Sequence, residues 1–160
     1  MKAGTLEIKA IHTPGHTPAC ASYLVNNKMV FTGDALFMPD FGVGRTDFPG
    51  GSTEDLYNSI FEKLYRLPDD VIVYTGHDYM PNGRELKFQS TIGEEKSENI
   101  QLNAKTEKEE FIKFRESRNK KLAAPRLLLP SIQVNIKGGN MPKAEDNGMM
   151  YLKIPLTPAK

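Results

Sequence analysis

Residues 28–34 read Lys-Met-Val-Phe-Thr-Gly-Asp, a short β-prone run that ends at a glycine and an aspartate. The preceding run, Cys20 to Val25, is also β-prone, and the Asn26-Asn27 pair between the two runs tolerates left-handed turn geometry. Together they predict a β-hairpin. Val71 to Thr75 predicts a buried strand that runs into Gly76-His77-Asp78 in the same way. Apolar runs of this chain therefore end in polar side chains that are able to bind a metal.

The segments around these strands predict further elements of a mixed α/β fold. Leu6, Ile8 and Ala10 alternate with charged residues, which is the period of a strand with one buried face. The following stretch, His12 to Pro18, holds too many prolines and glycines for a helix or a ladder, so it predicts a shaped loop. Ser52 is a good N-cap for a helix over residues 53–67, because apolar residues recur there at helical spacing before Pro68.

The second half of the chain is more charged and predicts helices from about residue 84 onward. Thr106 and Glu109 have the spacing of a capping box ahead of an apolar run. Residues 124–160 contain several prolines and glycines and predict an extended arm with a short strand near residues 151–154. No clean linker divides the chain. We therefore expect one partial domain over residues 1–160, with the strands in about 1–80 and the helical region and arm in 81–160.

Composition excludes several classes of function. The 160 residues carry 21 basic and 20 acidic side chains, so no net field attracts nucleic acid or an anionic membrane. No apolar run approaches the roughly 20 residues that span a bilayer, and we expect no membrane partner. The single Cys20 forms no internal disulfide, which favours a reducing, cytoplasmic location. Cys20 itself is interpreted as a small buried strand residue, since its neighbours include no activating cation.

Three polar residues stand just past the ends of predicted strands: His16, Asp34 and His77. The carboxyl ends of parallel or mixed strands place their ligand loops along one edge of a sheet. Two imidazoles and one carboxylate are a recurring ligand set for Zn and non-haem Fe. Taken singly, a histidine after a strand is more often a satisfied structural residue than a ligand, and Asp34 could equally be a turn residue bonded to its own backbone.

Three motifs carry a resemblance to a known family: Thr13-Pro-Gly-His-Thr-Pro18, Phe31-Thr-Gly-Asp-Ala-Leu36 and Tyr74-Thr-Gly-His-Asp-Tyr79. They resemble the later metal-binding motifs of the metallo-β-lactamase superfamily, in the family order. Gly44-Arg-Thr-Asp-Phe48 is more similar to the persulfide dioxygenase branch than to glyoxalase II. The resemblance implies the C-terminal half of an αββα sandwich, with a mixed sheet, flanking helices and a C-terminal extended arm.

The resemblance also implies roles for individual residues. His16 and Asp34 would be ligands of one Fe(II), or alternatively of Zn. His77 would bind a second metal in hydrolases, whereas in dioxygenases it would be a hydrogen-bonding group beside the metal. Arg45 would pair with a carboxylate of a glutathione-like substrate, with a structural ion pair as the alternative, and Tyr79 is a second substrate-binding candidate. Arg84 is a still weaker candidate, with a solvated loop cation as the alternative, and no catalytic residue is expected beyond the metal ligands.

One feature of the family is missing from this sequence. Full-length relatives carry an upstream His-x-His-x-Asp-His motif, while this chain contains only His12, His16 and His77. His12 lies in the same loop as His16, and its position argues for a structural role. The chain is therefore expected to be incomplete alone. Half of a sandwich also exposes an apolar sheet face, so we expect a homo-oligomer or completion by another chain.

Three functions of different classes remain open at this point. The first is a persulfide dioxygenase that acts on glutathione persulfide, a small-molecule thiol derivative. The second is a dinuclear zinc thioester hydrolase of the glyoxalase II type. The third is a catalytically inactive fragment or binding module.

Overall fold

The structure is a computed structural model that describes residues 1–123, 125 and 127–153. The chain forms two compact units, Met1–Lys121 and Leu122–Lys160, which are described separately. The first unit contains all six strands. No helix in the described residues has the length and apolarity that crossing a bilayer requires.

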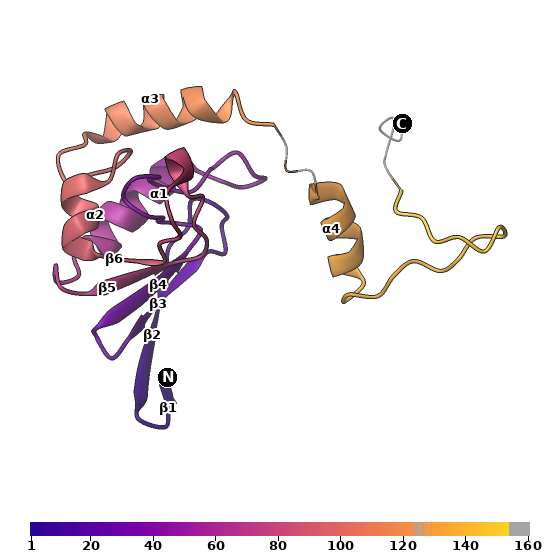
Figure 1. Ribbon diagram of the computed structural model, residues 1–160, viewed down its shortest axis with the longest axis horizontal. Helices are drawn as coiled ribbons and strands as arrows, with labels where there is room; N and C mark the ends of the chain where they lie inside the picture. Colours follow the sequence, from indigo (N-terminus) through magenta and orange to yellow (C-terminus); the bar gives the residue numbers. More distant parts are fainter. Residues whose placement is uncertain (124, 126, 154–160) are drawn as a thin grey trace. The chain divides into compact units, whose positions relative to one another are not determined.

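A mixed six-stranded sheet in the order β1-β2-β3-β4-β5-β6 organises the first unit (Figure 1). The strands are β1 (Lys2–Ala3), β2 (Leu6–His12), β3 (Ala21–Val25), β4 (Met29–Gly33), β5 (Ile72–Thr75) and β6 (Gln89–Thr91). Neighbouring strands are antiparallel except β4 and β5, which are parallel. Because β3 runs against both of its neighbours, β2, β4 and β5 all point the same way. Their carboxyl ends therefore meet at one edge of the sheet.

The predicted hairpin is confirmed. Strands β3 and β4 pair antiparallel with Tyr23 opposite Phe31, and the turn between them contains Asn26 and Asn27 at φ values of 50° and 51°. Asparagine is among the few residues that adopt this left-handed conformation readily. The predicted strands over residues 6–10 and 71–75 are also present, whereas β6 falls in a region for which the sequence predicted only helices.

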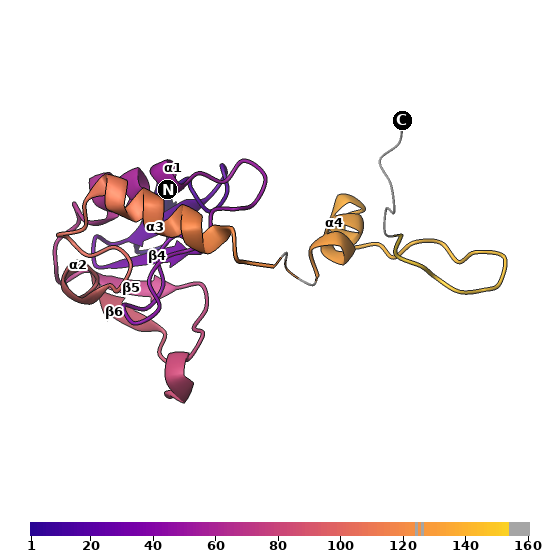
Figure 2. The same cartoon turned by 90° about the horizontal axis from the view of Figure 1, so that it is seen from above.

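One face of the sheet packs against helices and forms the core. Leu24, Val30 and Val73 lie side by side on adjacent strands of this face, and each is almost completely buried. They pack in one cluster with residues of the covering helices: Leu56, Ile60, Leu64, Ile92 and Phe111. Figure 2 shows helices α1 and α3 on one side of strands β4 and β5. The hydrophobic effect on this single face therefore holds the unit together.

The opposite face of the sheet is largely open and aromatic. A cross-strand row joins Ala10, Tyr23, Phe31 and Tyr74 on four successive strands. Tyr23 and Phe31 are 46% and 44% exposed, and the Phe31 and Tyr74 rings stack at 5.2 Å between centroids. An apolar row of this kind is unusual on a surface that faces only water.

The helices of the first unit are α1 (Thr53–Ser59), which continues as the π-helical turn η1 (Ile60–Leu64), α2 (Ile92–Glu98) and α3 (Lys108–Asn119). Ser52 caps α1 as predicted, because its hydroxyl accepts a hydrogen bond from the backbone N–H of Asp55. The capping box predicted at Thr106 is wrong. Residue 107 is the N-cap of α3, and the Thr106 hydroxyl bonds to Asn103 instead. The true capping box belongs to α2 and joins Thr91 to Glu94.

The second unit differs from the predicted arm. Helix α4 (Leu128–Ile136) occupies its centre, so the prediction of an extended chain is wrong for these residues. Pro130 is compatible with the helix because it stands at the third helical position. A backbone N–H there has no acceptor within the helix, so proline removes no helical hydrogen bond. Residues 151–153 carry no strand, and residue 154 lies outside the described residues. None of the side chains described in α4 is buried.

Candidate metal centre

Asp34 is the centre of the candidate site. It follows Gly33 at the end of β4, where the chain leaves the sheet with a φ of 54° at the glycine. The turn is fixed from both sides, since the Ala35 amide donates to the Thr32 carbonyl and the Thr32 hydroxyl donates to the Leu36 carbonyl. The Asp34 carboxylate is 37% exposed. It is therefore oriented by a rigid turn yet remains accessible.

His16 and His77 approach the two oxygens of this carboxylate from neighbouring strand ends. Nε2 of His16 lies 3.6 Å from Oδ2 of Asp34, and Nε2 of His77 lies 2.8 Å from Oδ1. His16 follows β2 and His77 follows β5, whose carboxyl ends share an edge with that of β4. The parallel direction of these strands therefore brings together the three residues that the sequence singled out.

A backbone carbonyl determines which nitrogen of His16 is available. Nδ1 of His16 lies 2.7 Å from the Arg45 carbonyl oxygen, which only accepts hydrogen bonds. Nδ1 therefore carries the hydrogen, and in the neutral ring Nε2 presents its lone pair toward Asp34. The ring is only 16% exposed and meets the Phe48 ring edge-on at 5.0 Å. His16 is thus held in the tautomer and orientation of a ligand.

Two glycines allow the backbone to approach Asp34 closely. A Cβ on Gly44 would lie 1.9 Å from the Asp34 carbonyl oxygen, and a Cβ on Gly76 would lie 2.9 Å from the Gly33 carbonyl oxygen and 3.2 Å from Oδ1 of Asp34. At both glycines the distance to the carbonyl oxygen is shorter than real Cβ contacts. The motifs around residues 44 and 76 therefore need glycine because of their position against the site.

The spacing of the donor atoms tests whether a metal fits. Two neighbouring ligands bound at about 2.1 Å to one metal lie about 3.0 Å apart in an octahedral centre. In a tetrahedral centre they lie about 3.4 Å apart. The 3.6 Å between His16 and Asp34 is close to this value, whereas the 2.8 Å between His77 and Asp34 is that of a direct hydrogen bond. No group of three or more His, Cys, Asp or Glu side chains among the described residues is arranged to hold a metal by itself. The donor set fits part of a metal centre, with His16 and Asp34 as the pair.

The predicted substrate residues occupy two different places. Arg45 forms a bidentate ion pair with Asp47, at 2.7 and 2.5 Å, and its guanidinium lies 5.1 Å from the centre of the Phe48 ring. The guanidinium holds the pKa of Asp47 below its usual range, mainly through these hydrogen bonds. Of the two roles considered for Arg45, the structure shows the structural ion pair. Tyr79 lies near His77, with ring centroids 5.5 Å apart, and is 52% exposed.

The remaining polar candidates lie outside this set of contacts. Nε2 of His12 bonds to the Pro18 carbonyl at 2.8 Å, in agreement with a structural role. Cys20 precedes β3 rather than lying in it and is half-buried, with its sulfur 3.0 Å from the Thr17 hydroxyl. Arg84 is not a solvated loop cation, because two carboxylates bind it. No local sequence signal marks Arg84, because one of its two carboxylate partners, Asp40, lies 44 residues away in the chain.

The sheet topology agrees with comparison to known proteins. Residues 2–77 match the family model described as the metallo-beta-lactamase superfamily. Residues 2–77 therefore belong to a domain of this superfamily, and the sheet has its mixed α/β architecture. It is 52% identical over 153 residues to "Glyoxylase B2" of Dictyostelium discoideum, covering 96% of this chain and 52% of that protein. It is 36% identical over 140 residues to "Persulfide dioxygenase ETHE1, mitochondrial" of Mus musculus, covering 87% of this chain and 51% of that protein.

Among solved structures, the chain is similar to ETHE1 from Myxococcus xanthus, with a TM-score of 0.74 and 40% sequence identity. The match covers 88% of this chain and 57% of the other. The chain therefore spans about half the length of these relatives. Its similarity to proteins with two different names leaves the particular reaction to be argued from the site.

Proposed function

We propose that the chain supplies the Asp34 portion of a metal centre in an enzyme of the persulfide dioxygenase kind, with Fe(II) as the metal. His16 and Asp34 are the ligands in this proposal, and His77 is a hydrogen-bond donor to the second carboxylate oxygen. The observation that carries it is the unequal spacing about Asp34, 3.6 Å to His16 and 2.8 Å to His77. Further ligands would come from outside the described residues, which hold no group of three suitable side chains.

Each residue of the site has a separate task. The Arg45 carbonyl keeps Nε2 of His16 available, and the turn after β4 orients the Asp34 carboxylate. A hydrogen bond from His77 to Oδ1 would leave Oδ2 as the oxygen that faces the metal. A bound iron supplies redox and Lewis-acid chemistry to a sulfur substrate.

The proposed substrate is a small thiol persulfide of the glutathione type. Arg45 would pair with a carboxylate of this substrate, for which Asp47 is the present competitor. Tyr79 would contact the substrate beside His77, since its ring is half exposed there. We propose a reducing, cytoplasmic location, because the single cysteine of the chain allows no internal disulfide.

A zinc thioester hydrolase is the second candidate, and the position of His77 favours it. The His77 side chain is 54% exposed and reaches the same carboxylate as His16. If its Nε2 released Asp34, it would be free to bind a second metal on the open side of the site. The similarity to a protein named glyoxylase points in the same direction.

Elemental analysis of the purified chain tests the proposal, alongside the variants His16→Ala and Asp34→Ala. Stoichiometric iron that is lost in both variants supports the proposed centre, and oxygen uptake with glutathione persulfide then tests the reaction. Zinc in place of iron, with thioester hydrolysis and no oxygen uptake, supports the second candidate. His12→Ala is the matched control, because the ring of this histidine bonds to the Pro18 carbonyl and not to Asp34. If no metal binds even when the same residues are joined to a partner or longer chain that supplies the further ligands, both candidates fail, and an inactive fragment or binding module remains.

We also propose that the open sheet face is covered in the functional protein by a second copy of the chain. Tyr23 and Phe31 lie side by side on this face and are nearly half exposed. Sedimentation velocity should detect an oligomer that Phe31→Glu weakens. A compact monomer at all concentrations would contradict self-association and favour completion by a different chain.

A further inference from the structure

The loop after β5 carries His77 but has little regular structure of its own. It continues through the three-residue turn η2 (Pro81–Gly83) before reaching β6. Met80 and Asn82 adopt left-handed φ values of 44° and 58°, and for methionine this conformation is strained. Such a loop keeps one conformation only if side-chain contacts determine it.

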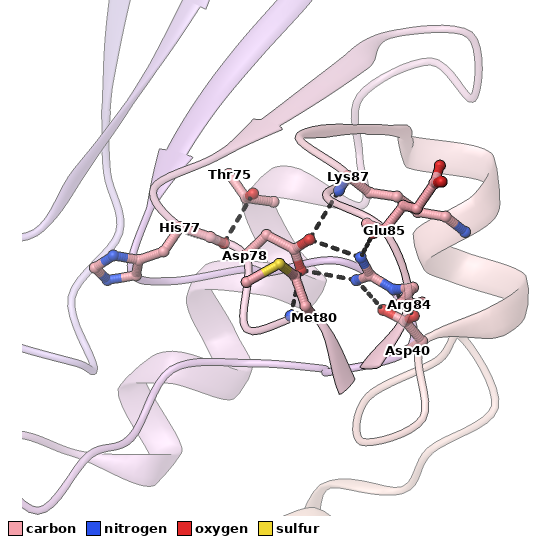
Figure 3. Close-up of polar contacts among 8 residues, drawn as sticks. All are labelled: Asp40, Thr75, His77, Asp78, Met80, Arg84, Glu85 and Lys87. Atoms are coloured by element: carbon pink, nitrogen blue, oxygen red, sulfur yellow. Dashed lines mark hydrogen bonds and ion pairs between the residues drawn. The ribbon is translucent and has the colours of Figure 1, made fainter. Parts of the chain in front are cut away.

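Arg84 supplies those contacts through two carboxylates (Figure 3). Its Nη1 and Nη2 donate to the two oxygens of Asp78 at 2.6 and 2.7 Å. Its Nε and Nη2 donate to the two oxygens of Asp40, the latter at 2.9 Å. A fifth bond runs from Nη1 to the Glu85 carbonyl at 2.8 Å. The planar guanidinium has the fork geometry that such double pairing requires, and lysine does not.

Asp78 is the point at which this clamp reaches the site. Its side chain is 1% exposed and also accepts hydrogen bonds from the backbone N–H groups of Met80 and Lys87. The guanidinium and these amides hold the pKa of Asp78 well below its usual range. Asp78 directly follows His77 in the chain. Fixing the buried Asp78 carboxylate therefore also fixes the backbone of His77.

The second carboxylate ties the clamp to the loop that follows Asp34. Asp40 lies next to Phe41, whose ring stacks on Tyr79 with 4.2 Å between centroids. Phe37 meets Tyr79 edge-on at 5.5 Å and lies 5.7 Å from the His77 ring. The rings of Phe37, Phe41 and Tyr79 thus form an aromatic wall beside His77, built from both loops. Arg84 is the residue that joins the polar sides of these loops.

We infer that Arg84 is a positioning residue, which holds His77 and Tyr79 in place beside Asp34 through its double clamp on Asp78 and Asp40. The inference deepens the proposed function and rests on it as far as metal binding is concerned. The positioning itself is a property of the metal-free chain and is measured without metal or substrate.

The first measurement is the histidine ring spectrum of the metal-free full chain by NMR. Only three histidines contribute, and replacing each in turn by Gln assigns them. Arg84→Ala should move the His77 ring signals toward those of a free histidine, because the neighbouring Phe37 and Tyr79 rings lose their fixed places. The His16 and His12 signals should stay unchanged. Arg66→Ala is the matched control, since Arg66 forms an exposed ion pair with Glu62 on a different element.

Two further variants keep the test decisive if Arg84→Ala does not fold. Asp40→Asn removes one arm of the clamp and leaves the Asp78 pair, so it should shift the His77 and Tyr79 signals in the same direction by a smaller amount. Arg84→Lys keeps the charge without the fork and should not restore the wild-type spectrum. Unchanged His77 and Tyr79 signals in Asp40→Asn and in folded Arg84→Lys would overturn the inference.

Metal titration of the same variants separates this inference from the proposed function. If the wild-type chain binds iron, Arg84→Ala should weaken binding roughly 10- to 100-fold, the effect expected of partners that orient a ligand or its hydrogen-bond donor. If no metal binds even with the further ligands supplied, the proposed function fails, while the histidine spectra still decide the positioning role. Unaltered metal affinity in Arg84→Ala, together with a displaced His77, would contradict the link between the clamp and the metal centre.

Discussion

The buried carboxyl group of Glu95 should make the stability of this protein fall between acidic and neutral pH. Glu95 is fully buried in α2, where Ser90 donates to Oε1 at 2.5 Å and Asn99 donates to Oε2 at 2.9 Å. Burial nevertheless dominates and raises the pKa of Glu95 from 4.5 to about 7. Between these two values the folded state binds more protons than the unfolded state, so the free energy of unfolding decreases as the pH rises.

The magnitude follows from the size of the shift. A rise from 4.5 to about 7 corresponds to about 3 kcal/mol between pH 4 and pH 8, at 1.36 kcal/mol for each pH unit. Glu95→Gln should abolish this dependence, because glutamine resembles the protonated acid in size. Its amide can donate to the Ser90 hydroxyl and still accept from Asn99. The variant should therefore be more stable than wild type at pH 8 and about equal to it near pH 4.

The assay is urea unfolding of wild type and Glu95→Gln at intervals from pH 4 to pH 8. Groups common to both proteins cancel in the difference between the two free energies, which isolates the contribution of Glu95. Glu98→Gln is the control, since Glu98 is exposed at the end of the same helix. Parallel stability curves for wild type and Glu95→Gln across this range would refute the reasoning.

Three further substitutions have outcomes that the structure determines, and chemical unfolding measures each of them. Gly44→Ala places a Cβ against the Asp34 carbonyl and should cost about 1–3 kcal/mol, with loss of any metal affinity; unchanged affinity would contradict the close approach. Leu64→Ala opens a cavity in the core and should cost about 2–5 kcal/mol, whereas Leu86→Ala, at a residue 63% exposed, should cost far less. Thr91→Ala removes the capping box of α2 and should cost about 1 kcal/mol, and a neutral result would show that the cap adds nothing.

The sequence predicted the strand ends well because the signals there are local. Alternating or continuous apolar residues mark β2, β4 and β5, and the change to Gly33-Asp34 and Gly76-His77 marks where each ladder stops. The meeting of three strand ends at one edge then required only that the strands run the same way. The proximity of His16, Asp34 and His77 followed from this.

The parts that the sequence did not predict depend on contacts between distant segments. Arg84 lies 44 residues from Asp40, and nothing in either local sequence shows that the two loops meet. Strand β6 is only three residues long and owes its pairing to β5 rather than to its own pattern. The spacing of Thr106 and Glu109 predicted a capping box, but the Thr106 hydroxyl donates to the side chain of Asn103 instead.

The hydrogen bond between His16 and the Arg45 carbonyl bears on how this protein could diversify. The contact uses the main chain of residue 45, so any amino acid that keeps the backbone in place would preserve the tautomer of His16. If Arg45 contacts the substrate as proposed, a change of its side chain can alter ligand preference without disturbing this hydrogen bond. The peptide group of residue 45 thus orients His16 whichever side chain it carries. Under the proposed function, a substitution at residue 45 could change specificity while His16 keeps its orientation.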